Sequence, residues 1–217
     1  MLSNELTKEN IIPFIKDIFD RRGSEEYLGE NVTIAEHMLQ AATLAEKKGY
    51  SETIIVAALL HDIGHFTSEF GSFEMNDKID RFHEDAGAKI LEKFFPTLVT
   101  DCVKFHVAAK RYLCATDASY YNKLSNASIH SLKLQGGLMS DEEVSKFQKN
   151  KNLNDIIKVR YLDDEGKIQN METPDFDYFI PIIKKVRMFY CVYAIFFCNF
   201  FIYKSMKIRS AIVHLVK

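Results

Sequence analysis

The chain has 217 residues, which suits one domain, because a single hydrophobic core typically serves about 100 to 200 residues. Its 47% hydrophobic and 27% charged residues, with only 9 Gly and 4 Pro, exclude a disordered, collagen-like or low-complexity protein and favour a helix-rich globular one. The formal net charge of -2 excludes global attraction to nucleic acid or anionic membranes, so any anion must be recognised by a local cluster of Lys, Arg and His.

Helical periodicity recurs along the chain, and no region alternates apolar and polar residues for long enough to predict a substantial sheet. We therefore predict an all-α fold. Thr33 and Glu36 match a capping box, which predicts a helix that starts there and ends at Gly49. His37 then lies in the second turn of this helix.

Ser51 can cap a second helix, whose run of aliphatic and small residues predicts burial on most sides until Gly64 ends it. His61 and Asp62 lie at the end of this core helix. An ionised carboxylate buried there without a partner would be strongly unfavourable. We therefore expect a cationic group to contact Asp62.

Further helices are expected at residues 83–95, 97–113 and 141–150, with a last one after Pro174. Loops rich in Gly, Asp and Ser are expected at residues 66–80, 114–127 and 162–174. His83 opens one of these helices, and Asp163 falls in the last of these loops.

The last forty residues differ in composition from the rest of the chain. They carry seven basic residues and no acidic one, which leaves a net charge of -9 on the first 177 residues. Residues 188–203 contain one polar side chain, Asn199, but fall short of the roughly 20 residues that a membrane-spanning helix needs. A buried final element, a membrane anchor and an atypical segment of little importance for activity all remain open. We therefore place the functional domain at residues 1–187 and an atypical apolar and basic tail at residues 188–217.

The cysteines and the N-terminus indicate the cellular compartment. The four cysteines form no CxxC pair, and the N-terminus lacks a basic segment followed by an apolar run. This pattern favours free thiols in the cytoplasm.

Four histidines and two aspartates from five separate segments form a candidate metal site. A single His on an apolar helix face is usually a hydrogen-bonded core residue, so the argument rests on the whole set. Imidazoles and carboxylates without thiolates suit iron, manganese or nickel better than structural zinc. An Asp next to a His can bridge two ions, because its two oxygens are free to face different metals. The candidate ligands are His37, His61, Asp62, His83, His106 and Asp163.

The motif HDIGH at residues 61–65, with one His upstream and two downstream, resembles the HD-domain superfamily of metal-dependent phosphohydrolases and related oxygenases. Further stretches resemble a narrower group, the PhnZ-type mixed-valent diiron oxygenases of phosphonate catabolism, which are related to myo-inositol oxygenase. HVAAKRYL and the stretch from LSNAS to QGG are the most specific, because a generic HD hydrolase has no reason to keep them. The stretches are YLGE (27–30), EHMLQAA (36–42), AALLHDIGH (57–65), HEDAGAKIL (83–91), HVAAKRYL (106–113), LSNASIHSLKLQGGLM (124–139) and RYLDDEGK (160–167).

This resemblance implies an HD-domain helical bundle with a dinuclear iron site in its core. One iron would be held by His37, His61, Asp62 and Asp163, and the other by Asp62, His83 and His106. The two irons would work in a mixed-valent Fe(II)/Fe(III) state with O2 as co-substrate. The substrate would chelate the second iron through its hydroxyl and one phosphonate oxygen, which leaves the first for dioxygen.

Several side chains are expected to recognise the phosphonate group. Lys110, Arg160 and His65 each lie three or four residues from a candidate ligand, so they should converge on the metals. Hydroxyls and amides are suitable donors to phosphonate oxygens. The resemblance adds three such donors to the cradle, namely Ser128, Ser131 and Gln135. The alternatives are solvated surface charges for Lys110 and Arg160 and helix caps for the two serines.

Tyr27 and Glu30 lie three residues apart, upstream of the first candidate ligand. In the family that the sequence resembles, the tyrosine is thought to occupy an iron position until substrate displaces it, and the acid to meet the substrate amine. The alternative is a pair of surface loop residues. The resemblance thus implies direct catalytic roles for Asp62, His65 and Tyr27.

These residues together predict an iron- and O2-dependent enzyme that cleaves the carbon-phosphorus bond of a 1-hydroxy-2-aminoethylphosphonate-like substrate. It would release phosphate and glycine or a related amino acid. The alternatives are an HD phosphohydrolase acting on a nucleotide or phosphate ester through a metal-bound water, and a silent metal-binding or sensor domain. We expect a small-molecule phosphonate as partner, no nucleic acid, and membrane contact only through the tail. The sequence does not show whether the accepted amine is primary or trimethylated.

Overall fold

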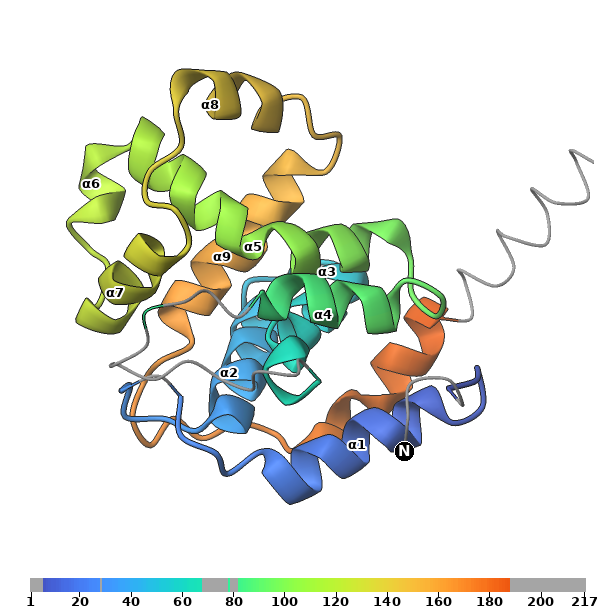
Figure 1. The fold of residues 1–217 in the computed structure, drawn as a ribbon. Helices are drawn as coiled ribbons and strands as arrows, with labels where there is room; N and C mark the ends of the chain where they lie inside the picture. Colours follow the sequence, from blue (N-terminus) through green and yellow to red (C-terminus); the bar gives the residue numbers. More distant parts are fainter. Residues whose placement is uncertain (1–5, 28, 68–77, 79–81, 188–217) are drawn as a thin grey trace, which may run out of the picture.

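The computed structural model describes residues 6–27, 29–67, 78 and 82–187, and this part of the chain is mainly helical (Figure 1). Within it, the only extended pairing is an isolated antiparallel bridge between Glu26 and Thr33. The predicted all-α fold is confirmed. The helices are α1 (Ile11–Arg22), α2 (Ile34–Lys47), α3 (Glu52–Leu60), the short 3-10 helix η2 (Ile63–Phe66), α4 (His83–Leu91), α5 (Thr97–Thr116), α6 (Ala118–Tyr121), α7 (Asn126–Leu134), α8 (Asp141–Phe147), α9 (Leu153–Glu165), and a last helix from residue 176 that is described to residue 187.

The core of the molecule is built from α2, α3, α5 and α9. α3 packs against α2, α5 and α9, while α4 packs against α5 and η2. Every residue of α3 from Ile54 to Leu60 is buried, because other helices surround it. The two residues that follow its last turn, His61 and Asp62, therefore lie inside the protein.

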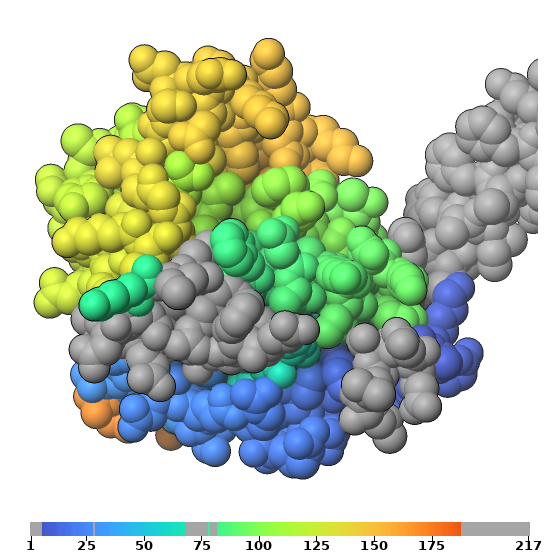
Figure 2. Space-filling model, viewed as in Figure 1, coloured from blue at the N-terminus to red at the C-terminus, as the bar shows by residue number. Residues whose placement is uncertain are grey.

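The remaining helices cover the two ends of this core (Figure 1). At one end α1 lies beside the helix 176–187, and the rings of Phe19 and Phe176 have centroids 4.6 Å apart. At the other end lie α6, α7 and α8, and Figure 2 shows α7 and α8 above α1 and α2 on one face. The α6–α7 end has a small apolar cluster of its own, separate from the main core, formed by Leu113, Cys114, Tyr120 and Leu132.

Local sequence signals set both ends of α2. Thr33 and Glu36 form the predicted capping box, with both reciprocal hydrogen bonds present. Gly49, just beyond the helix, has a φ of 69°, a left-handed conformation that glycine adopts without strain. By contrast, Ser51 occupies the N-cap position of α3, but its side chain makes no capping hydrogen bond.

The prediction that Gly64 ends the second core helix is wrong. α3 ends at Leu60, and Gly64 lies in η2. A Cβ atom on Gly64 would overlap the backbone carbonyl of His83. Glycine at this position therefore allows the start of α4 to approach η2, which sets the position of His83.

Four further helices, α1, α6, α7 and α9, were not predicted from the sequence. α1 carries a readable apolar stripe that includes Ile11, Ile15 and Ile18, all buried. α6 and the start of α7 lie in the stretch 114–127 that was expected to be a loop. α9 runs to Glu165, so Asp163 lies in its last turn and not in a loop. The acidic residues after Leu162 favour a loop, but burial of Val159 and Leu162 in the core continues the helix.

Two other predictions concern residues outside the described part of the chain. These are the loop at 66–80, most of which is not described, and the apolar stretch 188–203. Among the described residues, no helix has both the length and the apolar character needed to cross a membrane.

Candidate metal centre and substrate cavity

Six buried polar side chains from five helical segments converge in the core, and each is at most 4% exposed. α2 supplies His37, the end of α3 supplies His61 and Asp62, α4 begins with His83, and α5 and α9 supply His106 and Asp163. These are the six residues that the sequence predicted as ligands, and the structure brings all of them together.

The carboxylate of Asp62 lies between two pairs of imidazoles. Its Oδ2 atom is 3.4 Å from Nε2 of His37 and 3.5 Å from Nε2 of His61. Its Oδ1 atom is 3.3 Å from Nε2 of His83 and 3.2 Å from Nε2 of His106. One oxygen faces each pair, which is the arrangement that a carboxylate bridging two metal ions requires.

Asp163 belongs to the first of these pairs. Its Oδ1 atom is 3.5 Å from Nε2 of His37, and its Oδ2 atom is 3.9 Å from Nε2 of His61. The first group of donors therefore has one carboxylate more than the second. We call the whole set of six side chains the ligand cluster.

Backbone carbonyls orient three of the imidazoles. Nδ1 of His37 donates to the carbonyl of Gly166 at 2.8 Å. Nδ1 of His61 and Nδ1 of His106 each donate at 2.7 Å to the carbonyl three residues earlier in the chain. With the proton assigned to Nδ1 in this way, each Nε2 atom presents a lone pair to the centre of the cluster.

These lone pairs require a cation. Nε2 of His37 lies 2.9 Å from Nε2 of His61, and Nε2 of His83 lies 3.2 Å from Nε2 of His106. In the metal-free protein, a proton on His37 serves as the cation of the first pair. Burial opposes this protonation, but the adjacent carboxylates raise the pKa of His37 to about 9. Burial lowers the pKa of His61 to about 4, so His61 stays neutral. A metal ion would take the place of that proton.

The two carboxylates are ionised. Burial alone would raise the pKa of Asp62, but the imidazoles around it, among them the protonated ring of His37, hold it well below its usual value. Burial would also raise the pKa of Asp163. Arg160, whose Nη1 atom lies 2.6 Å from Oδ2 of Asp163, chiefly holds this pKa well below its usual value. Neutral imidazoles and ionised carboxylates are the forms that bind metal, so the residues present fit a two-metal centre.

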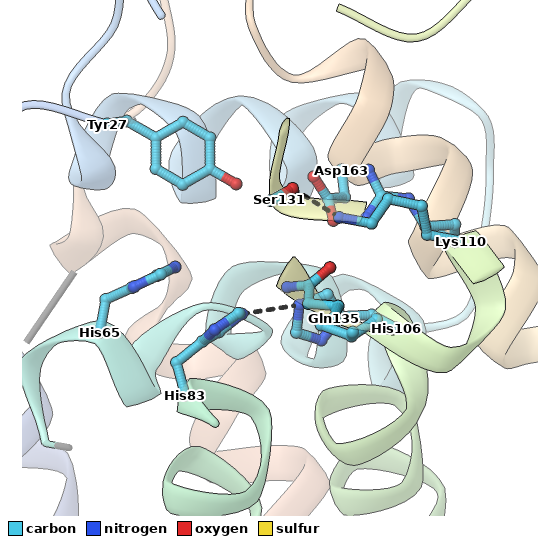
Figure 3. A pocket seen from close by; sticks show the side chains of 10 residues that line it. Tyr27, His65, His83, His106, Lys110, Ser131, Gln135 and Asp163 are labelled. Carbon is cyan, nitrogen blue, oxygen red and sulfur yellow. Dashed lines mark hydrogen bonds and ion pairs between the residues drawn. The ribbon is translucent and has the colours of Figure 1, made fainter. Parts of the chain in front are cut away.

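A small polar cavity lies beside the ligand cluster, with about 280 Å³ of space that atoms do not fill, part of it open to solvent (Figure 3). Only one of its ten lining residues is aliphatic, so the cavity suits a small polar ligand and not an extended apolar one. The lining residues are Tyr27, His65, His83, His106, Val107, Lys110, Ser131, Gln135, Arg160 and Asp163.

Lys110 gives the cavity an anion-binding character. It is 4% exposed, and its Nζ atom donates to Oγ of Ser131 at 2.7 Å. Burial, together with the charge of Arg160, lowers the pKa of Lys110 to about 7. An anion beside Lys110 would offset this desolvation and favour its protonated form.

Arg160 is held in place by contacts that sequence reasoning missed. Asp164 accepts hydrogen bonds from the guanidinium, including one from Nε at 3.1 Å. Tyr120 of α6 donates to Oδ2 of Asp164 at 2.6 Å. Asp164 follows Arg160 by four residues, a spacing that could have indicated this pair, whereas no local signal connects Tyr120 with it.

His65 and Gln135 also line the cavity, as expected. The ring of His65 stacks on that of His83 with centroids 4.0 Å apart. Burial, and after it the charge of His83, lowers the pKa of His65 well below its usual value, so this imidazole is neutral. Oε1 of Gln135 is buried and accepts no hydrogen bond from the described residues.

Tyr27 lies over the first group of ligands. Its ring stacks on that of His37 with centroids 4.2 Å apart, and its hydroxyl points into the cavity (Figure 3). Burial and the charges of Asp62 and Asp163 raise its pKa well above its usual value. Tyr27 is therefore a buried phenol beside the candidate metals and not a surface residue.

Two of the residues predicted to bind substrate, Ser128 and Glu30, lie outside the cavity lining and contact a lysine that sequence reasoning missed. Nζ of Lys167 donates to Oγ of Ser128 at 3.1 Å and lies 3.5 Å from Oε1 of Glu30. The same oxygen of Glu30 accepts a hydrogen bond from Ser125 at 2.6 Å. Lys167 follows Asp163 by four residues, and this spacing could have indicated a contact between their side chains.

Comparison with known proteins agrees with this geometry. Residues 34–126 match the family model of the HD domain. The chain is 64% identical over 183 residues to the [1-hydroxy-2-(trimethylamino)ethyl]phosphonate dioxygenase (glycine-betaine-forming) of Leisingera caerulea, covering 84% of this chain and 93% of that protein. The chain belongs to the HD-domain phosphonate dioxygenases. A hydroxymethylphosphonate dioxygenase of Gimesia maris is 43% identical over 153 residues, which cover 70% of this chain and 76% of that protein.

Membership of the HD-domain phosphonate dioxygenases explains the combination of features in the core. The HD-domain match spans the segments that carry His37, His61, Asp62, His83 and His106. Asp163 and three other polar residues of the cavity wall, Ser131, Gln135 and Arg160, lie beyond the C-terminal end of that match, on or just after α7 and on α9. The ligand cluster is thus largely an HD-domain feature, whereas much of the cavity comes from segments that follow it.

Proposed function

We propose that this chain is an iron- and O2-dependent enzyme that cleaves the carbon-phosphorus bond of a 1-hydroxy-2-aminoethylphosphonate-like substrate. The observation that carries the proposal is the placing of Asp62 between two imidazole pairs, next to a polar cavity with Lys110 and Arg160 in its wall. The products would be phosphate and glycine or a related amino acid. One substrate and one O2 supply every atom and electron of these products, so no other co-reactant is needed.

The six residues of the ligand cluster would hold two irons, with Asp62 shared between them. When bound, the irons supply the redox chemistry by which O2 oxidises the carbon that carries the hydroxyl and phosphonate groups. The donor set, which has no thiolate, suits iron in a catalytic site better than structural zinc. Cys102 and Cys114 are free and buried outside the cluster.

The cavity residues would bind and orient the phosphonate. Lys110 and Arg160 supply positive charge, and the Ser131 hydroxyl and the Gln135 amide supply hydrogen bonds. Because these groups are fixed in a cavity of small volume, they would hold the oxidisable carbon at one distance from the ligand cluster.

His65 would accept a proton from the substrate, and Tyr27 would control access to the ligand cluster. His65 is a neutral imidazole in the cavity wall that does not belong to the ligand cluster, so its role would be to accept the proton of the substrate hydroxyl. Tyr27 covers the first group of ligands and would move aside when substrate enters, while Glu30 would meet the substrate ammonium group.

The relatives guide the choice of substrates to test. The name of the Leisingera caerulea protein specifies a trimethylated amine, and that of the Gimesia maris protein a phosphonate without an amine. We therefore propose to assay 1-hydroxy-2-aminoethylphosphonate, its N-trimethyl form and hydroxymethylphosphonate side by side.

The decisive experiment measures phosphate release and O2 consumption together, on protein purified without air and analysed for metal. An oxygenase should contain iron, consume one O2 per phosphate released and stop under argon. Equal phosphate release under argon with Mn, Mg or Co would instead indicate an HD phosphohydrolase. Metal binding without turnover of any of these compounds would indicate a silent domain.

A further inference from the structure

The segment that carries Tyr27 and Glu30 forms a small arm between α1 and α2. We define the arm as residues 26–27 and 29–33. At its base Glu26 and Thr33 form the antiparallel bridge, and the amide of Tyr27 donates to the carbonyl of Val32 at 3.3 Å. At its tip the amide of Glu30 donates to the carbonyl of Tyr27 at 2.7 Å, in a turn where Gly29 has a φ of 68°.

Lys167 contacts the tip of this arm from the other side of the site. It lies just beyond the end of α9, with its side chain 12% exposed, and its Nζ atom is 3.5 Å from Oε1 of Glu30. The same Nζ lies 5.5 Å from the ring centroid of Tyr27 and 3.9 Å from Oδ1 of Asp163. One ammonium group therefore contacts both side chains at the tip and a member of the ligand cluster.

We propose that Lys167 is a positioning residue that latches the arm in its closed position, and that the substrate ammonium group opens the latch by replacing Lys167 at Glu30. This inference rests on the proposed function. Glu30 has a side chain only 15% exposed, and the oxygen next to Lys167 also accepts a hydrogen bond from Ser125, so a cation that binds this oxygen would have to replace Lys167. An arriving ammonium group and Lys167 would repel each other, whereas a substrate without an amine would not compete for Glu30.

Hydrogen exchange of the substrate-free protein tests the latch without any need for turnover. In Lys167→Met the amides of Tyr27 and Glu30 should exchange about fivefold faster than in wild type, the size expected for the loss of one partly buried ion pair. Lys167→Arg keeps the cation and should restore most of the protection. Lys48→Met is a matched control, because Lys48 pairs with Glu165 at 2.7 Å near the same end of α9 but on the surface.

The ratio of two KM values tests the competition for Glu30. In Lys167→Met the KM for 1-hydroxy-2-aminoethylphosphonate should fall about fivefold relative to the KM for hydroxymethylphosphonate, because only the first substrate competes with Lys167. Any weakening of phosphonate binding through Ser128 affects both substrates and cancels in the ratio. An equal rise in both KM values would place Lys167 in the phosphonate cradle and overturn the latch.

The exchange and kinetic results separate the two proposals. Unchanged exchange of the arm in a folded Lys167→Met protein, judged by a thermal unfolding midpoint close to that of Lys48→Met, would overturn the latch whatever the activity. Faster exchange that Lys167→Arg reverses, in a protein that oxidises none of the phosphonates, would support the latch as a closure of the cavity and contradict the proposed function.

Discussion

The ligand cluster and the substrate side of the cavity are built in different ways. The ligands lie on or beside the helices of the core, are at most 4% exposed, and three of their imidazoles are fixed by backbone carbonyls. The substrate side combines a turn, the short helices α6 and α7 and contacts between side chains, including those of Glu30 and Lys167. A hydrogen bond to a backbone carbonyl keeps its acceptor unless the fold changes, whereas a contact between two side chains is lost with a single substitution. We therefore expect the HD-domain phosphonate dioxygenases to share a metal centre and to differ in substrate at the arm and α7.

Replacing Asp62 should have the largest effect, because this carboxylate faces both imidazole pairs. We expect Asp62→Ala to lose both metals and at least about 10³-fold in activity. Metal analysis of protein purified without air measures this directly. Asp163→Ala should weaken only the first metal position, and Asp155→Ala, a partly exposed carboxylate of the same helix that pairs with Lys158, should retain both metals. Two irons per chain in Asp62→Ala would contradict the bridging role.

Replacing Lys110 tests phosphonate binding separately from metal binding. In Lys110→Met, KM for the phosphonate should rise by about 10- to 100-fold while the metal content stays unchanged, since the lost contact is a buried charge-assisted one. Lys104→Met, on the exposed surface of the same helix, is the matched control. An unchanged KM would remove Lys110 from the phosphonate cradle.

The pH dependence of KM sharpens the same test. With a pKa of about 7, Lys110 is charged below pH 7 and increasingly neutral above it, so phosphonate affinity should decline as the pH rises through 7. Lys110→Met should lack this part of the pH profile. A profile that is identical in the variant and the wild type would assign the titration to another group.

The same contrast explains which parts of the molecule could be read from the sequence. The ligands stand beside strong local signals, such as the capping box before His37 and the apolar run before His61. Asp164 and Lys167 stand four residues after Arg160 and Asp163, a spacing that indicates these local pairs, but their contacts with Tyr120 and Glu30 join distant segments and could not be predicted. Tyr120, for example, reaches Asp164 across 44 positions of the chain. Sequence periodicity reports which face of a helix is buried, but not which polar groups meet there.

His37 offers a smaller, pH-dependent effect at the metal centre. Its pKa of about 9 means that the metal-free protein carries a proton between His37 and His61 at neutral pH. A metal must displace that proton, so its apparent affinity should rise by up to about tenfold per pH unit below 9 and level off above. Calorimetric titration with Mn(II) in buffers of different ionisation enthalpy counts the released protons. Metal uptake with no proton release at pH 7 would show that His37 binds as a neutral imidazole from the start.

Replacing Ser131 should change the KM for the phosphonate least, because this residue acts on the substrate partly through Lys110. Its Oγ atom accepts a hydrogen bond from Lys110 at 2.7 Å and donates to the carbonyl of Ser128 at 3.1 Å, so it fixes the ammonium group relative to α7. Ser131→Ala removes a hydrogen bond with a net worth of about 1 kcal/mol, which corresponds to an increase in KM of roughly fivefold. Ser131→Thr keeps the hydroxyl and should stay within about twofold of wild type. If both variants weakened phosphonate binding equally, the size and packing of the side chain at position 131 would determine the affinity, and its hydroxyl group would not.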